Sequence, residues 1–150
     1  MLVRLAVPED TDRLLELMIG LAKYEEYIDE FAVTRESILK HGFGDERLFT
    51  AFVAEHDGNL VGMAVTFPIQ WTYTLRPKLV LKELYVDEAA RSLGAGKALV
   101  EAVTAHARSM NAAEVIWTVM TGNTAAEYFY RSLGASPERK WNNWTLSLDE

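Results

Sequence analysis

One feature constrains the fold of this chain most. It is a strand pattern followed by a glycine-containing turn and then by a helix pattern. Residues 77–86 (PKLVLKELYV) alternate in the manner of a strand, and residues 91–99 (RSLGAGKAL) follow with two glycines between an arginine and a lysine. Backbone N–H groups at a helix start are unpaired and favour an anion, and glycine lets a phosphate approach closely. The segment therefore predicts either a phosphate-binding turn or a glycine-relieved turn beside a surface arginine.

Two other phosphate-binding motifs fail on spacing. A Walker A loop ending at Gly96-Lys97 would need glycine in place of Arg91 and serine or threonine in place of Ala98. A Rossmann fingerprint would need glycine or alanine in place of Leu99. The pattern that remains is R-x-x-G-x-G after a strand.

The rest of the chain predicts one α/β domain spanning residues 1–150. Apolar periodicity and turn signals predict helices over 10–21, 34–42, 95–110 and 123–133, and strands over 2–7, 49–55, 59–67, 77–86, 114–120 and 144–148. This order predicts a mixed sheet with helices on both faces and at least one parallel strand pair. No repeat or linker-like stretch interrupts the pattern.

Composition excludes several function classes. The formal net charge of −7 argues against a nucleic-acid binder, which would need a basic face. The chain has no cysteine, so thiolate nucleophiles and cysteine-bound zinc are excluded, and its three histidines lack metal-ligand spacing. No apolar run is long enough to cross a membrane, and the first residues lack a signal-peptide stretch. We expect a cytoplasmic protein without a metal or membrane partner.

Several short motifs, correctly ordered, resemble the GNAT superfamily of N-acetyltransferases. The agreement is greatest with the spermidine/spermine and thialysine acetyltransferase branch, and it lies in LAKYEE (21–26), HGFG (41–44), LYVDEAARSLGAGKAL (84–99) and NTAAEYFYRSLGA (123–135). The resemblance implies a GNAT fold with a mostly antiparallel sheet and one parallel strand pair. It also implies that the phosphates are those of acetyl-CoA, the co-substrate, and that the protein is a homodimer.

The resemblance assigns roles to individual positions. The backbone of residues 84–86 would bind the pantetheine arm and thioester, and the glycine turn would surround the pyrophosphate. The cofactor contacts implied are Leu84, Tyr85, Val86, Arg91, Ser92, Leu93, Gly94, Ala95, Gly96, Lys97, Asn123 and Ala126. Tyr24 and Glu25 match residues that contact the amine. Tyr130 matches the tyrosine that the family uses as general acid, although its helical spacing alone favours a core residue.

The chain differs from the polyamine branch at the position of the general base. At the position of Lys82 the polyamine branch has a glutamate that reaches the substrate amine. A lysine there would suit an acceptor that carries a carboxylate as well as an amine, such as a lysine-like amino acid, or it pairs with a surface carboxylate. Glu83 is adjacent, but strand alternation turns it to the other face. The acidic residues Glu25, Glu26, Asp29 and Glu30 either attract a cationic acceptor or form a solvated face.

The sequence thus predicts an acetyl-CoA-dependent N-acetyltransferase acting on a small primary amine by direct attack in a ternary complex. An acetyl-cysteine intermediate is impossible without cysteine. Three alternatives remain open: a protein or peptide N-acetyltransferase, a non-catalytic module that binds acetyl-CoA, and a nucleotide-binding domain that uses the same glycine turn.

Overall fold

The computed structural model describes residues 1–149, which form two compact units. The first unit is Met1–Thr118 and the second begins at Val119. The first unit contains β1 (Leu2–Leu5), α1 (Thr11–Tyr24), α2 (Arg35–His41), β2 (Thr50–His56), β3 (Asn59–Ile69), β4 (Lys78–Val86), α3 (Ala95–Ser109) and β5 (Val115–Ile116), with short 3-10 segments η1 (Pro8–Asp10), η2 (Ile28–Glu30) and η3 (Glu88–Leu93).

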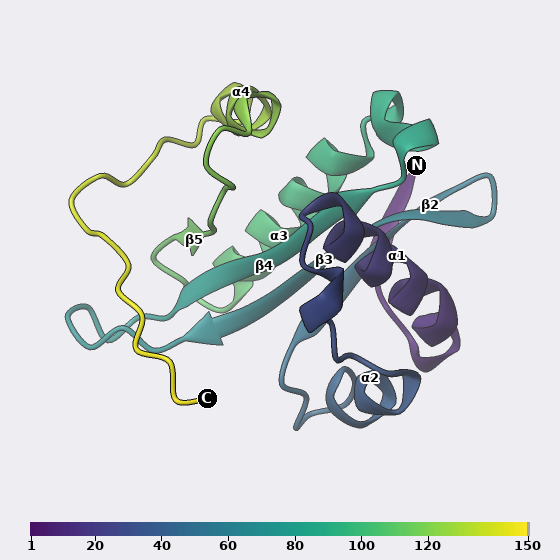
Figure 1. The fold of residues 1–150 in the computed structure, drawn as a ribbon, viewed down its shortest axis with the longest axis horizontal. Helices are drawn as coiled ribbons and strands as arrows, with labels where there is room; N and C mark the ends of the chain where they lie inside the picture. The colour runs from purple at the N-terminus through teal and green to yellow at the C-terminus, as the bar shows by residue number, and fades with distance from the viewer. Residues whose placement is uncertain (150) are drawn as a thin grey trace. The chain divides into compact units, whose positions relative to one another are not determined.

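One sheet organises the first unit, with its strands in the order β1-β2-β3-β4-β5 (Figure 1). Neighbouring strands run antiparallel except β4 and β5, which are parallel. The parallel pair follows from the crossover through α3, because a strand can return to the same direction only after such a connection. The predicted mixed sheet with one parallel pair is confirmed.

The two faces of the sheet carry separate apolar cores. On β2, Ala51 and Val53 pack in a core with the apolar residues of α1 and α2, whereas Phe52 and Ala54 pack in a second core with α3. This is the period-2 alternation of a strand buried on both sides. Burying each large aliphatic side chain in these cores contributes roughly 1.5–3 kcal/mol. The helices therefore cover both faces, as predicted.

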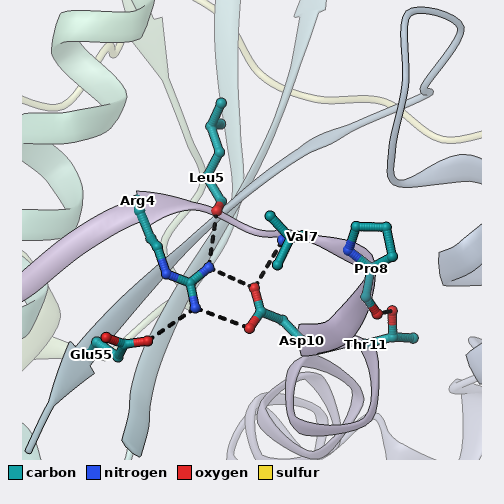
Figure 2. Close-up of polar contacts among 7 residues, drawn as sticks. All are labelled: Arg4, Leu5, Val7, Pro8, Asp10, Thr11 and Glu55. Atoms are coloured by element: carbon teal, nitrogen blue, oxygen red, sulfur yellow. Dashed lines mark hydrogen bonds and ion pairs between the residues drawn. The ribbon is translucent and has the colours of Figure 1, made fainter. Parts of the chain in front are cut away.

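Polar contacts fix the start of α1 against the sheet. Figure 2 shows the Arg4 guanidinium donating to both carboxylate oxygens of Asp10, at 2.7 and 3.1 Å, and to Glu55 at 3.0 Å. The backbone N–H of Val7 donates to the same Asp10 carboxylate at 2.8 Å. The hydrogen bonds from Arg4 hold the pKa of Asp10 below its usual value, although burial opposes the shift. These bonds connect β1 and β2 with η1, which leads directly into α1.

A bulge in β4 changes which face its side chains occupy. Val65 pairs with Glu83 but the next residue of β3, Thr66, pairs with Leu81, so Lys82 is an extra residue without a partner on β3. The register places Glu83 and Tyr85 opposite Val65 and Met63, whose side chains lie in the core beneath α1. Strict alternation predicts Glu83 on the face of Leu79 and Leu81, which pack in the core with α3. That expectation is wrong, because the extra residue shifts the alternation.

Two expected strands differ from the structure. The strand predicted over 114–120 is confined to Val115–Ile116. No strand forms over 144–148, where Trp144, Leu146 and Leu148 are 94%, 86% and 91% exposed. Alternation predicts a strand only where a neighbouring backbone pairs with it, and residues 144–148 pair with no strand in the described chain.

The second unit contains the helix α4 (Thr124–Ser132). Asn123 caps it, since its Oδ1 accepts a hydrogen bond from the Ala126 N–H at 3.1 Å, as the predicted helix start requires. Ala126, Phe129, Tyr130 and Leu133 are the half-buried apolar positions of this helix and its cap. Within residues 1–149, no helix combines the length and the hydropathy needed to cross a bilayer.

Candidate active site

The glycine turn has the conformation of a helix start. Gly94 takes the left-handed region at φ +82°, and α3 begins at the next residue. Its first helical hydrogen bond runs from the Ala98 N–H to the Gly94 carbonyl, so the N–H groups of residues 95–97 precede the helical ladder. A Cβ on Gly94 would meet no atom within 4 Å. Its backbone conformation, rather than crowding, therefore favours glycine here.

An ion pair from α1 anchors the chain where it leaves β4. The Asp87 N–H donates to the Val61 carbonyl at 2.8 Å, and the Asp87 carboxylate accepts a hydrogen bond from Arg13. The same guanidinium donates through Nε to the Leu60 carbonyl at 3.0 Å. These bonds fix the segment that leads into η3 and the glycine turn. Sequence reasoning missed Arg13 because nothing in its local pattern marks it.

The edge of β4 that faces β5 is open over its last residues. Among residues 1–149, β5 pairs only with Leu79 and Val80, whereas Leu84, Tyr85 and Val86 are paired on their other side with β3. In an antiparallel strand, alternate residues direct their N–H and C=O groups to the opposite edge. The open edge therefore presents backbone donors and acceptors next to the glycine turn, where an extended ligand can add to the sheet.

Arg91 lies between this edge and α1. Its Nε donates to the Val86 carbonyl at 3.1 Å, and its guanidinium lies 5.3 Å from the ring centroid of Tyr24 and 5.8 Å from that of Tyr85. Both distances fall within the range of a cation–π interaction. The first residue of the glycine motif thus contacts the expected acceptor residue Tyr24, a contact that sequence spacing does not reveal.

Glu83 is a functional candidate that sequence reasoning set aside. Burial raises the pKa of its carboxyl, the Lys82 ammonium opposes the shift, and Glu25 raises the pKa further. Burial likewise raises the pKa of the Tyr27 phenol, with smaller contributions from Glu83 and then Glu25. Glu25 acts on both Glu83 and Tyr27, and Glu83 acts on Tyr27, so the three residues lie within electrostatic range of one another. A half-buried carboxylate with a raised pKa holds a proton more tightly than an exposed one does, which suits a proton acceptor.

The other predicted residues of the first unit lie around this cluster and turn. Lys82 is exposed at the bulge, and Tyr24 ends α1 with 53% of its surface exposed. Lys97 is exposed in the first turn of α3, where its Nζ lies 4.0 Å from Glu101. Ser92 and Leu93 are exposed in η3.

The predicted residues of the second unit lie on or next to α4. Asn123 and Ala126 form its cap, and Tyr130 is half-buried, with its ring centroid 5.4 Å from that of Phe129. Tyr128, on the same helix, is 79% exposed. No group of three or more histidine, aspartate or glutamate side chains suited to a metal ion occurs among residues 1–149.

The mixed sheet, its open β4 edge and the helix-start turn are features of an acetyltransferase fold. The model of the Acetyltransferase (GNAT) family matches residues 13–135, and the chain belongs to that family. It is therefore an enzyme of the N-acetyltransferase class. The family uses acetyl-CoA as co-substrate.

The similar proteins include members of the expected branch. The chain is 26% identical to thialysine N-epsilon-acetyltransferase of Sus scrofa, over 95% of this chain and 88% of that protein. It is 30% identical to spermidine/spermine N(1)-acetyltransferase-like protein 1 of Homo sapiens, over 99% of this chain but only 23% of that protein.

Solved structures confirm the fold. The crystal structure of a probable acetyltransferase matches with a TM-score of 0.82 at 21% identity, over 100% of this chain and 99% of that one. An aminoglycoside acetyltransferase from an uncultured soil metagenomic sample, in complex with sisomicin, matches with a TM-score of 0.81 at 20% identity, over 99% of this chain and 96% of that one.

Proposed function

We propose that the protein transfers the acetyl group of acetyl-CoA to a primary amine of a small molecule, either a diamine or a lysine-like amino acid. The observation that carries the proposal is the bulge in β4, which brings Glu83 to the α1 side at the start of an open strand edge. The names of the thialysine and spermidine/spermine relatives support this class of acceptor. The two compact units would act as one domain, since the family match spans both.

The residues of the first unit fit acetyl-CoA. The backbone groups of residues 84–86 would hold the extended pantetheine arm along the open edge. The N–H groups that precede the ladder of α3 would hold the pyrophosphate, together with Arg91 and residues 92–97. When bound, acetyl-CoA supplies an activated acyl group and a thiolate leaving group. An N–H of Tyr85 or Val86 would donate to the acetyl oxygen as negative charge develops there.

Proton transfer would use one carboxylate and one phenol. Glu83, ionised, would accept the proton that the acceptor ammonium must lose before its nitrogen can attack. The new N–C bond then forms as the C–S bond breaks. Tyr130 would donate a proton to the departing sulfur. The nitrogen would then lose its second proton to the Tyr130 phenolate, and Glu83 would release its proton to solvent, so that the products are a neutral amide and the free thiol. Asn123 and Ala126 would hold the cofactor near that tyrosine.

The acceptor would be recognised by charge. Glu25, with Tyr24 beside it at the end of α1, would bind a distal ammonium. Lys82, exposed at the bulge, would bind a carboxylate, which favours a lysine-like amino acid over spermidine. We also propose that the protein is a homodimer, as the resemblance to its branch implies, and sedimentation analysis should give twice the 16.9 kDa chain mass.

The test is thiol release from acetyl-CoA across spermidine, putrescine, thialysine, lysine and short peptides. We expect release with one class of small amine and a higher KM for a cationic acceptor in Glu25→Gln. Release with peptides alone would instead identify a protein acetyltransferase. Tight acetyl-CoA binding without release would indicate a binding module, and competition of ATP with acetyl-CoA would indicate a nucleotide site.

A further inference from the structure

Arg91 makes its protein contacts with the acceptor side of the molecule. It lies in η3, three residues before Gly94, but its guanidinium contacts the rings of Tyr24 and Tyr85, and its Nε is bound to the Val86 carbonyl. No other hydrogen bond or ion pair of Arg91 occurs among residues 1–149. The side chain therefore joins three elements: the end of β4, the end of α1 and η3.

The two rings that Arg91 contacts differ in how they are held. Tyr85 packs against the core beneath α1, where a Cβ on Gly20 would lie 2.9 Å from its ring and hydroxyl. Tyr24 is the last residue of α1 and is 53% exposed, so little packing restrains its ring. The guanidinium therefore rests on one fixed ring and one exposed ring.

We infer that Arg91 is a positioning residue for the acceptor, which holds Tyr24 and the adjoining Glu25 against the fixed ring of Tyr85. This inference rests on the proposed function and adds a role to the place of Arg91 in the cofactor turn. It follows that the last turn of α1 is held by the segment that leads into the glycine turn. Removing the guanidinium should then weaken acceptor binding more than cofactor binding.

Kinetics of Arg91→Ala, Tyr24→Leu and the double variant test the inference, with the acceptor that the amine panel identifies. A cation–π contact at a half-exposed site corresponds to roughly a three- to fivefold change in a binding constant. We expect the acceptor KM to rise about three- to tenfold in Arg91→Ala, with a smaller rise in the acetyl-CoA KM and kcat within twofold. The double variant should be little worse than Tyr24→Leu alone, because Arg91 acts on the acceptor through the Tyr24 ring.

Arg108→Ala is the matched control, since Arg108 is an exposed arginine in the last turn of α3. It should leave both KM values unchanged. If Arg91→Ala instead raised the acetyl-CoA KM tenfold and left the acceptor KM unaltered, Arg91 would be a phosphate ligand alone and the inference would be wrong. Additive effects of the two substitutions on the acceptor KM would also overturn it.

Amide hydrogen exchange supplies a readout that needs no turnover. The Glu25 N–H donates to the Leu21 carbonyl at 2.9 Å and closes the last turn of α1. In the ligand-free protein, exchange at residues 22–25 should be several-fold faster in Arg91→Ala and unchanged in Arg108→Ala. Equal exchange in both would overturn the inference. If the wild-type protein acetylated no amine, the proposed function would be wrong. The exchange rates of Arg91→Ala and Arg108→Ala would still decide whether Arg91 holds α1.

Discussion

A comparison of two tyrosines of α4 can show whether Tyr130 has a chemical role or only a structural one. Tyr130 is half-buried and Tyr128, two residues earlier, is 79% exposed. If Tyr130 returns the proton to the leaving sulfur, Tyr130→Phe should lower kcat by about tenfold or more, because the ring stays and only the hydroxyl is lost. Tyr128→Phe should leave kcat unchanged. Steady-state kinetics with thermal melts on both variants checks this, and an unaltered kcat in Tyr130→Phe would remove Tyr130 from the mechanism.

The carboxylate of Glu83 should set the acid limb of the pH profile. Its pKa is raised by burial, so the fall in kcat/KM on acidification should begin above the ordinary value of 4.5. Glu83→Gln should abolish that limb and lower kcat/KM about 100-fold, since the base is absent. Glu101→Gln, at an exposed position of α3, should retain the wild-type profile. An unchanged limb in Glu83→Gln would assign the base elsewhere.

At the scale of the element, two glycines with the same conformation allow the proposed function of the glycine turn to be tested. Gly94 and Gly58 have φ of +82° and +78°, and a Cβ on either would meet nothing within 4 Å. Alanine at each position should therefore cost a similar amount of stability, about 1–2 kcal/mol. Only Gly94→Ala should also raise the acetyl-CoA KM, severalfold or more. Calorimetric titration with coenzyme A compares the two, and equal affinities would show that the turn does not bind the phosphates.

Most elements were predictable because their periodicity and caps are local. Thr34 caps α2 and Asn123 caps α4 through hydrogen bonds to residues three positions later, which sequence spacing reveals. The bulge at Lys82 was not predictable, because it depends on how β4 registers against β3. For the same reason the sequence could give neither the face of Glu83 nor the contact of Arg91 with Tyr24. The prediction of a strand over 144–148 was wrong, because alternation along one segment does not show whether another strand pairs with it.

At the scale of the whole molecule, the proposed base Glu83 should lower the free energy of unfolding at neutral pH. A carboxyl whose pKa is raised in the folded state binds its proton more tightly than in the unfolded chain. Its contribution to the free energy of unfolding is therefore present at low pH and is lost as pH rises from the unfolded pKa through the folded one. Glu83→Gln should be more stable than wild type at neutral pH, and the difference should shrink on acidification. Urea unfolding at several pH values measures it, and a less stable variant at neutral pH would contradict the argument.

The extra residue in β4 has a consequence for how the chain tolerates changes in length. Deleting one residue from a buried strand normally reverses every later side chain between the two faces. Without Lys82, Glu83 would follow Leu81 directly and pair with Val65 as it does now, beside Thr66 and its partner Leu81. The cores on the two faces would keep their residues, and only the local bend would be lost. This strand can therefore shorten by one residue at Lys82 without exchanging its faces, so the architecture and the local shape of the proposed acceptor site can evolve separately.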